Sequence, residues 1–235
     1  MEIFEILPST NDVAYDSAMA GAPHLYAVLA KSQSAGRGRQ GRSFLSPAGG
    51  TYLSIVLRPA LPHAAYGVIP PVAAMLVRRV LARVAGVNAD IKWVNDLLLG
   101  GKKLAGLLAK SGVDCAGKPF VVLGIGINTG GSVPAEIAEI ATAIAYPDPV
   151  GLAHALLTQF AALDEVLAGD WCAEYRLYAP FLGSMITVHE RGTVRAARAL
   201  DILPDGALRI LEENGTVTAL VGDEITLRTA QNDRL

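Results

Sequence analysis

The stretch that most constrains the fold covers residues 120–127, where almost every residue is apolar. A strand with one solvated face alternates polar and apolar residues, so an unbroken apolar run predicts a strand that is buried on both faces. The composition supports this interpretation, because 51% of the 235 residues are hydrophobic and only 18% are charged. We therefore expect a buried central strand within an α/β core.

Other segments of the first 182 residues have the patterns of strands and helices. Alternating or apolar runs predict strands over residues 2–7, 24–30, 51–57, 89–93, 96–99 and 102–110. Helical spacing predicts helices over residues 11–20, 68–84, 150–167 and 171–181. Gly100 and Gly101 are typical of a tight hairpin turn, so the strands on either side of them should pair.

The pattern of the sequence changes after Leu182. Short alternating segments cover residues 185–189, 194–203, 207–211, 217–220 and 224–227, and glycine-containing turn signals separate them. Five short strands in so short a segment predict a small β-barrel. The sequence thus predicts two domains, over residues 1–182 and 183–235.

The overall charge excludes some functions. A net charge of -2 and an isoelectric point near 6.1 leave no overall basic field that would hold nucleic acid, so positive charge is only local. Cys115 and Cys172 are too few and too far apart in the sequence to indicate a disulfide framework or a zinc site. We expect both to be buried, reduced thiols.

Neither a secretory signal nor a membrane span is predicted. Glu2 and Glu5 occupy positions where a signal peptide would need basic residues. The most apolar run, over residues 66–77, is too short to cross a bilayer and contains Pro70 and Pro71. We therefore expect a cytoplasmic protein that does not enter a membrane.

A glycine and arginine loop occupies residues 36–42, with the sequence Gly-Arg-Gly-Arg-Gln-Gly-Arg. Glycine allows backbone to approach a ligand closely, and arginine offers a fixed fork of donors that matches carboxylate or phosphate. The glycines also have the spacing of a dinucleotide-binding loop, but such a loop must open a helix, and a strand is predicted here. The loop is therefore predicted to bind a small anion in another way.

A second charged cluster lies in the predicted hairpin. Residues 92–96 read Lys-Trp-Val-Asn-Asp, and residues 102–106 read Lys-Lys-Leu-Ala-Gly. Pairing of these strands would gather the charges at one end, near the Gly-Ile-Gly-Ile-Asn sequence of residues 124–128 that ends the central strand. A carboxylate beside lysines could hold Mg²⁺ together with phosphate oxygens. The alternative is an ordinary solvated hairpin with a surface ion pair.

Taken together, these segments resemble biotin protein ligases. The family's motifs occur in order as S-T-N at residues 9–11, G-R-G-R-x-G-R at 36–42, K-W-x-N-D at 92–96, K-L-A-G at 103–106 and G-x-G-x-N at 124–128. The resemblance covers essentially the whole chain. It implies an α+β fold, with a mixed-sheet catalytic domain like those of class II synthetases over residues 1–182. It also implies an SH3-like C-terminal β-barrel over residues 183–235.

The resemblance implies a ligase that uses ATP and biotin as substrates, with Mg²⁺. The carboxylate of biotin attacks the α-phosphate of ATP to give biotinyl-5′-AMP and pyrophosphate, and a lysine of a biotin carboxyl carrier protein then attacks the acyl-adenylate. Arg37 and Lys103 are expected to contact the carboxylate and the α-phosphate, because fixed cations lower the cost of joining two anions. Asp96 is the third expected catalytic residue. It acts either through Mg²⁺ or by taking a proton from the incoming lysine.

The resemblance also implies binding residues for each substrate. Biotin contacts are expected from Ser9, Thr10, Asn11, Gln33, Arg37, Gly38, Arg39 and Lys103. Contacts with ATP or the adenylate are expected from Arg39, Arg42, Phe44, Asn95 and Asn128. Phe44 stands where the family often has tryptophan and keeps an aromatic face for adenine. Val94 stands where proline is common, a difference in backbone stiffness alone.

Several alternatives stay open at this point. A lipoate or octanoate ligase would share the fold and the lysine, but its glycine-rich loop is built differently. A non-catalytic biotin or nucleotide sensor would not need Lys103, Asp96 and Arg37. The S-T-N segment begins at position 9, which leaves no room for the winged helix-turn-helix of some family members, so we expect a short form without specific DNA binding. The sequence does not decide whether the chain forms a homodimer, which carboxylase it serves, or whether the loop is ordered without ligand.

Overall fold

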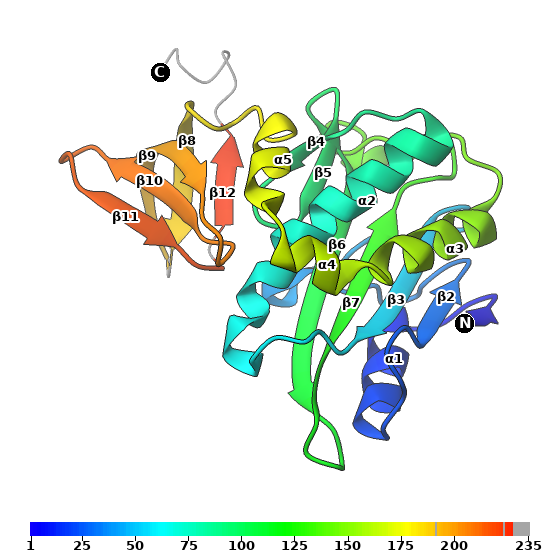
Figure 1. Ribbon diagram of the computed structural model, residues 1–235. Coiled ribbons are helices and arrows are strands. Elements are labelled where there is room, and N and C mark those ends of the chain that lie inside the picture. The colour runs from blue at the N-terminus through cyan, green and yellow to red at the C-terminus, as the bar shows by residue number, and fades with distance from the viewer. Residues whose placement is uncertain (191, 223, 228–235) are drawn as a thin grey trace.

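The computed structural model describes residues 1–190, 192–222 and 224–227, and these residues form two sheets (Figure 1). The larger sheet has seven strands in the order β1-β2-β3-β7-β6-β5-β4. Its strands are β1 (Glu2–Phe4), β2 (Ala27–Ala30), β3 (Thr51–Leu57), β4 (Asp90–Lys92), β5 (Asp96–Leu99), β6 (Lys102–Val113) and β7 (Pro119–Ile127). Because β1 pairs with β2 in parallel and the other neighbours are antiparallel, the sheet is mixed, as expected.

The apolar run that was predicted to be central is strand β7, which lies between β3 and β6 in the middle of the larger sheet. Alternate residues of the central strands face two different hydrophobic layers. Leu123 packs in the larger cluster with Leu53 and Ile55, whereas Val122 packs in the smaller cluster with Val56. The prediction of a strand buried on both faces is therefore confirmed.

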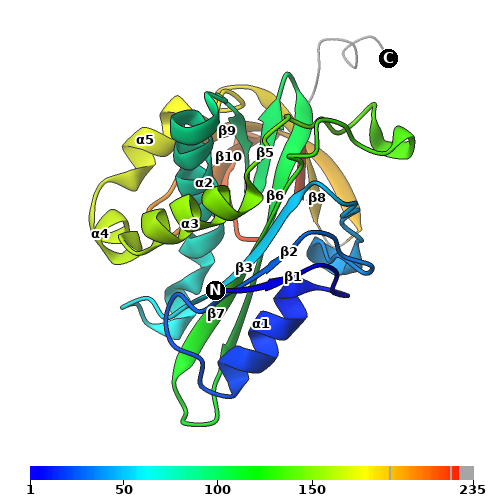
Figure 2. The same cartoon turned by 90° about the vertical axis from the view of Figure 1, so that its right-hand side faces the viewer.

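Helices cover both faces of the larger sheet (Figure 2). One face is covered by α2 (Ile69–Ala85), α3 (Pro149–Phe160), α4 (Leu163–Ala168) and α5 (Trp171–Leu177), and the other by α1 (Thr10–Met19). Helix α2 begins with prolines in its first turn and ends at Gly86, whose φ of 65° is the left-handed conformation that glycine adopts without strain. Short 3₁₀ segments η1 (Arg39–Gly41), η2 (His63–Val68) and η3 (Ala135–Ile137) lie in the connections.

Two predictions about the helical and cysteine-containing segments were wrong. The single helix predicted over 150–167 is interrupted between α3 and α4. Phe160 and Leu163 on either side of the break are both buried, so the apolar spacing continues across the break and does not reveal it. Cys172 is buried as expected, but Cys115 is exposed because it lies in the turn between β6 and β7.

The second sheet contains the strands predicted after Leu182. They are β8 (Met185–Glu190), β9 (Thr193–Ile202), β10 (Leu208–Glu212), β11 (Val217–Leu220) and β12 (Glu224–Leu227), in the antiparallel order β11-β10-β9-β8-β12. Among the described residues no ladder joins β11 to β12, so the expected closed barrel is not found. Within that same part of the chain, no helix is both long and apolar enough to cross a membrane.

Candidate active site

The candidate site is a cavity of about 140 Å³ between α1, the glycine and arginine loop, and strands β6 and β7. Of the predicted site residues, those that line it are Ser9, Thr10, Asn11, Gln33, Arg37, Gly38, Arg39, Arg42, Phe44, Asn95, Asp96 and Lys103. Segments that are far apart in the sequence therefore meet at one place, as the motifs predicted. Tyr52 and Ser54 of β3 also line the cavity, although neither was predicted.

One end of the cavity is a buried hydrogen-bonding set at the start of α1. The backbone N–H and the hydroxyl of Thr10 donate to Gln33 Oε1, at 2.8 and 3.1 Å, and Thr10 Oγ1 lies 2.8 Å from Ser54 Oγ. Gln33 Nε2 in turn donates to Ser46 Oγ at 2.8 Å. These bonds hold the polar groups in fixed directions at the cavity wall.

Asn11 differs from its neighbours in this set. Its side chain is buried, and within the described part of the chain its Nδ2 has no hydrogen-bond partner. A buried donor without an acceptor costs free energy, so this amide favours a ligand that brings an acceptor oxygen. Ser9 occupies the N-cap position of α1, and no side-chain cap bond uses its hydroxyl. Both residues are thus placed to contact a polar ligand.

Ser54 could have been found from the sequence by one signal. It is the polar residue in the middle of an apolar strand, and it is fully buried. Tyr52 gives no such signal, because a tyrosine in a strand is ordinary. In the structure its hydroxyl donates to the carbonyl of Pro47 at 2.8 Å, and burial raises the pKa of Tyr52, so the phenol stays protonated.

Two facing glycines form the floor of the cavity. The register of β6 and β7 places Gly106 opposite Gly126. A Cβ at Gly126 would lie 2.6 Å from the Phe44 ring, and one at Gly106 would lie 2.9 Å from Lys103 Cε. A side chain at Gly126 would clash with the aromatic ring that lies on its backbone, and one at Gly106 would require the flexible end of Lys103 to move.

The charged end of the cavity contains Lys103 and Asp96. Lys103 Nζ lies 2.7 Å from Asp96 Oδ1 and 5.8 Å from the centre of the Phe44 ring. The hairpin turn at Gly100 and Gly101, both with positive φ, brings the two strands together, as predicted. The Lys103 side chain remains 35% exposed, so its ammonium group is accessible to a ligand.

Three arginines of the loop line the same cavity, and protein partners of Arg37 and Arg39 show how the loop is held. Arg37 Nε lies 2.8 Å from Asp12 Oδ2 in the first turn of α1. Arg39 Nη1 donates to Asn95 Oδ1 at 3.3 Å, and its Nη2 donates to the carbonyl of Gly222 in the second sheet. The prediction that arginine and lysine from separate segments converge on one cavity is confirmed.

The loop has defined internal hydrogen bonds. The N–H of Gly38 donates to the carbonyl of Arg42 at 2.7 Å, and the N–H of Phe44 donates to that of Gly36 at 2.9 Å. The loop contains the 3₁₀ turn η1 and leads to strand β3. Since it does not open an α-helix, the dinucleotide-binding interpretation is excluded, as the sequence predicted.

Asn128 lies elsewhere, and it is absent from the residues that line the cavity. Its Nδ2 donates to the carbonyl of Thr142 at 2.9 Å, and its backbone N–H donates to that of Leu104 at 3.0 Å. These bonds tie the segment after β7 to the start of β6 and to the segment after η3. Asn128 is thus bonded to backbone carbonyls near Lys103, and its expected contact with a nucleotide stays a prediction.

A metal would find few ligands from the chain itself. Among the described residues no three His, Cys, Asp or Glu side chains come together. Asp96 is the carboxylate that lines the cavity, with Asn95 beside it. One carboxylate completed by phosphate oxygens is an arrangement that Mg²⁺ accepts, so these residues are compatible with Mg²⁺ brought by a nucleotide.

Comparisons with known proteins agree with this geometry. Residues 3–128 match the sequence model of the biotin/lipoate A/B protein ligase family. Because the match covers more than half of the chain, the chain belongs to that family. The matched residues 3–128 include every residue that was found to line the cavity except Ile225.

Individual relatives are similar over different parts of the chain. The bifunctional ligase/repressor BirA of Bacillus subtilis is 36% identical over 144 residues, 60% of this chain and 44% of that protein. The chain therefore spans less than half the length of the first relatives it matches. The biotin--[acetyl-CoA-carboxylase] ligase of Mycobacterium tuberculosis is 33% identical over 241 residues, 94% of this chain and 86% of that protein.

Solved structures show the same fold. The biotin protein ligase of Aquifex aeolicus in complex with biotin and ATP superposes with a TM-score of 0.79 at 22% identity, covering 97% of this chain and 98% of that one. Biotin protein ligase from Leishmania major in complex with biotinyl-5-AMP gives a TM-score of 0.64, covering 94% and 98%. The α+β architecture with a mixed sheet and a second antiparallel sheet is therefore that of the biotin protein ligases.

Proposed function

We propose that this chain is an ATP-dependent ligase that activates biotin as biotinyl-5′-AMP and transfers it to a lysine of a biotin carboxyl carrier protein. The observation that carries the proposal is the convergence of Arg37, Arg39 and Lys103 on a cavity whose other end is a buried hydrogen-bonding set. A ligand that is anionic at one end and polar at the other matches both ends. The names of the relatives supply the same substrates.

In the proposed binding mode, the ureido ring of biotin lies at the start of α1. The unpartnered Nδ2 of Asn11 would donate to an acceptor oxygen of the ring, which removes the cost of its burial. Ser9, Thr10 and Gln33 supply the other polar contacts. The apolar tail of biotin then runs beside the Phe44 ring, which covers Gly106 and Gly126, with its carboxylate toward Lys103.

In the proposed first step, a carboxylate oxygen of biotin attacks the α-phosphorus of ATP. The new bond joins the carboxylate to the α-phosphate, and the bond to the β-phosphate bridging oxygen breaks, so that pyrophosphate leaves. Lys103 and Arg37 would lie beside the two anions and reduce their repulsion. Arg39 and Arg42 would bind phosphate oxygens from the loop side.

In the proposed second step, the amine of the carrier lysine attacks the acyl carbon and AMP leaves. The amine must lose a proton, and Asp96 would accept it if Lys103 were drawn toward the phosphate. Mg²⁺ held by Asp96 and phosphate oxygens would supply charge neutralisation on the phosphates. In this scheme Asp96 either accepts the proton or holds the metal ion, and the pH dependence of the transfer rate would differ between these two roles.

The second sheet and its surroundings complete the proposal. We infer that residues 183–235 are an SH3-like domain that follows the catalytic domain of residues 1–182, and that it assists ATP or carrier binding. The acceptor is a biotin carboxyl carrier domain of a carboxylase, and the location is the cytoplasm. No specific DNA binding is proposed.

One experiment tests the function directly. The protein is incubated with biotin, Mg-ATP and a carrier domain, pyrophosphate is measured, and the carrier is weighed by mass spectrometry. The expected result is pyrophosphate release that depends on biotin, together with one added biotinyl group per carrier. Release with lipoate but not with biotin would instead identify a lipoate ligase, and binding of biotin without pyrophosphate release would identify a sensor.

A further inference from the structure

The indole of Trp93 makes a contact that the proposed mechanism does not use. Its Nε1 donates to the carbonyl of Gly206 at 3.0 Å, a buried hydrogen bond between the candidate site and the turn that joins β9 to β10 in the second sheet. Trp93 is 3% exposed and lines the cavity described above. A residue of the K-W-V-N-D segment thus holds the second sheet.

The turn that receives this hydrogen bond is held tightly. Gly206 has a φ of 88°, and a Cβ there would lie 3.0 Å from the carbonyl oxygen of Gly67 and from Val68 Cα. Backbone atoms just before α2 therefore leave no room for a side chain. The carbonyl that accepts from Trp93 has a fixed position relative to the larger sheet.

A different segment of the second sheet contacts the loop. The carbonyl of Gly222 accepts a hydrogen bond from Arg39 Nη2, while Arg39 Nη1 donates to Asn95 Oδ1. Asn95 lies two residues after Trp93. The K-W-V-N-D segment therefore contacts Arg39 directly through Asn95, and through Trp93 it contacts the second sheet, which also carries Gly222.

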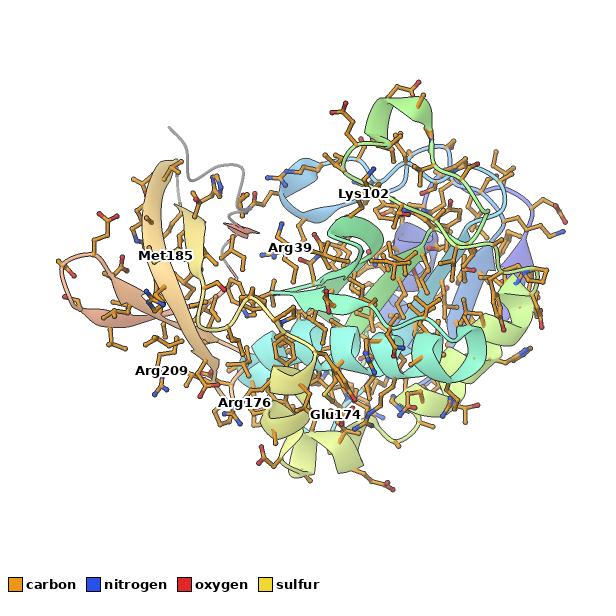
Figure 3. All side chains as sticks on the ribbon, turned by 90° about the horizontal axis from the view of Figure 1, so that it is seen from above. Arg39, Lys102, Glu174, Arg176, Met185 and Arg209 are labelled. Atoms are coloured by element: carbon orange, nitrogen blue, oxygen red, sulfur yellow. The ribbon has the colours of Figure 1, made fainter. Side chains whose placement is uncertain are left out.

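The second sheet shares the hydrophobic core of the larger sheet, but a cavity interrupts the packing near these contacts. This cavity has a volume of about 210 Å³, and the residues that line it include Arg39, Val94, Asn95, Gly206 and Gly222. Figure 3 shows Arg39 between the ribbons of the second sheet and the rest of the chain. Near Arg39, the Gly222 carbonyl is therefore placed by the contacts that border this cavity, and the Trp93 hydrogen bond to Gly206 is one of them.

We propose that Trp93 is a positioning residue: by holding the β9–β10 turn, it sets where the second sheet presents the Gly222 carbonyl and so keeps Arg39 over the cavity. The proposal rests on the proposed function only for its kinetic consequences, since the contact network itself does not depend on the substrate. In this way the second sheet helps to hold the glycine and arginine loop in place.

The chain offers a matched control on the same interface. Arg176 of α5 forms two hydrogen bonds with Asp201 of β9, at 2.7 and 3.2 Å, and neither residue lines the cavity at the site. Figure 3 shows Arg176 well away from Arg39. Asp201→Asn weakens the attachment of the second sheet at a distance from the site, whereas Trp93→Phe weakens it at the site and keeps an aromatic ring.

The first measurement is hydrogen exchange of the backbone amides of residues 36–42, which needs no enzymatic activity. Trp93→Phe should speed exchange of this loop by about fivefold, the effect of losing about one neutral hydrogen bond. Asp201→Asn should leave loop exchange unchanged even where it lowers the thermal midpoint. Equal loop exchange in Trp93→Phe and the parent protein would overturn the proposal.

The second measurement is release of free biotinyl-AMP. Arg39→Ala and Trp93→Phe should each increase it, and the double variant should release no more than Arg39→Ala alone, because Trp93 acts through Arg39. Additive effects would refute this coupling. If the parent protein makes no adenylate, the proposed function fails, while the exchange result still decides the role of Trp93. If Trp93→Phe does not fold, benzothienylalanine at position 93 keeps the ring shape and removes the N–H donor.

Discussion

At the scale of single residues, the site is organised around Lys103. Its stem lies on Gly106, and its ammonium group is shared between Asp96 and the face of Phe44. The carboxylate keeps the ammonium at the cavity wall before a substrate arrives, and an incoming phosphate would compete for it. In the proposed reaction the ammonium group of Lys103 would therefore exchange the Asp96 carboxylate for a phosphate of the substrate.

Replacing Lys103 by methionine tests this arrangement. Lys103→Met keeps most of the stem but loses the charge, and a charge-assisted hydrogen bond is worth about 1.5–3 kcal/mol, so adenylate formation should fall by about tenfold or more. The measurement is biotin-dependent pyrophosphate release. Lys102→Met is the control, because Lys102 Nζ donates to the carbonyl of Ala138 instead. Near-normal release by Lys103→Met would remove this lysine from the mechanism.

A second residue-scale prediction concerns the floor of the cavity. In Gly126→Ala the new methyl group would lie 2.6 Å from the Phe44 ring and must displace it. Overpacking of this kind costs about 1–3 kcal/mol, so biotin affinity should fall by about tenfold. Isothermal titration with biotin measures the effect. Gly169→Ala, where a Cβ would have only ordinary contacts, is the control and should bind biotin normally.

Most of the site residues could be predicted because they lie in compact motifs whose chemistry is visible locally. Ser54 carries a signal as a polar residue in an apolar strand, but neither its role nor that of Asp12 is visible locally. Their roles depend on partners far along the chain, Thr10 and Arg37, and such pairings exist only once the sheet register and the position of α1 are known. Asn128 shows the reverse case: its motif was correct, but its side chain turns toward backbone carbonyls.

At the scale of elements, α1 matters because it carries the buried polar set, and Arg58 secures its C-terminal end. Arg58 Nε and Nη2 donate to the carbonyl of Ala22 just after α1, at 3.1 and 3.0 Å. Arg58 Nη1 also lies 2.9 Å from Asp114 Oδ2 in the turn between β6 and β7. The helix and the hairpin are thus joined through one arginine.

The carboxylate of this pair predicts a pH dependence of stability. Hydrogen bonds from the N–H groups of Lys118 and Ala116, together with Arg58, hold the pKa of Asp114 below its ordinary value of 3.8. A lowered pKa gives stability that is present above the unfolded value and is lost as the pH falls through the folded one. Asp114→Asn should therefore be less stable than the parent protein at pH 7.

Urea unfolding at a series of pH values measures the difference between the two proteins. The difference should be constant above about pH 5 and should shrink below pH 3.8, as the parent carboxyl becomes protonated. A difference that stays the same at pH 3 would show that Asp114 contributes through its shape and not through its charge. Glu136→Gln, in the exposed η3 segment, is the control for general charge removal.

Strand positions were predictable from alternation and apolar runs, and β3 and β5 have the predicted limits. Helix ends and breaks were harder. The break between α3 and α4 keeps Phe160 and Leu163 in the core, so packing and not local propensity decides it. The boundary near Leu182 stays a prediction, although the second sheet begins at Met185.

At the scale of the whole molecule, charge is distributed unevenly. The chain has a net charge of -2, yet Arg37, Arg39, Arg42 and Lys103 all line one cavity. A local positive field on a weakly acidic protein attracts small anions over short distances without attracting polyanions as a class.

This distribution predicts a difference between the two substrates. Raising the ionic strength from about 0.05 to 0.5 M shortens the screening length several-fold, so the KM for ATP should rise. The KM for biotin should change much less, because biotin has one charge and ATP has about four. Steady-state pyrophosphate release at several salt concentrations gives both constants. Equal changes in the two KM values would show that the cations lining the cavity do not attract ATP more strongly than biotin through long-range electrostatics.

The bare backbone of Gly106 and Gly126 also limits how the protein can be re-engineered. Because the Phe44 ring lies directly on both backbones, a side chain at either position has to displace that ring. Room for a bulkier ligand would have to come from the ring that covers these glycines, and Phe44 is the group that a designer can shorten.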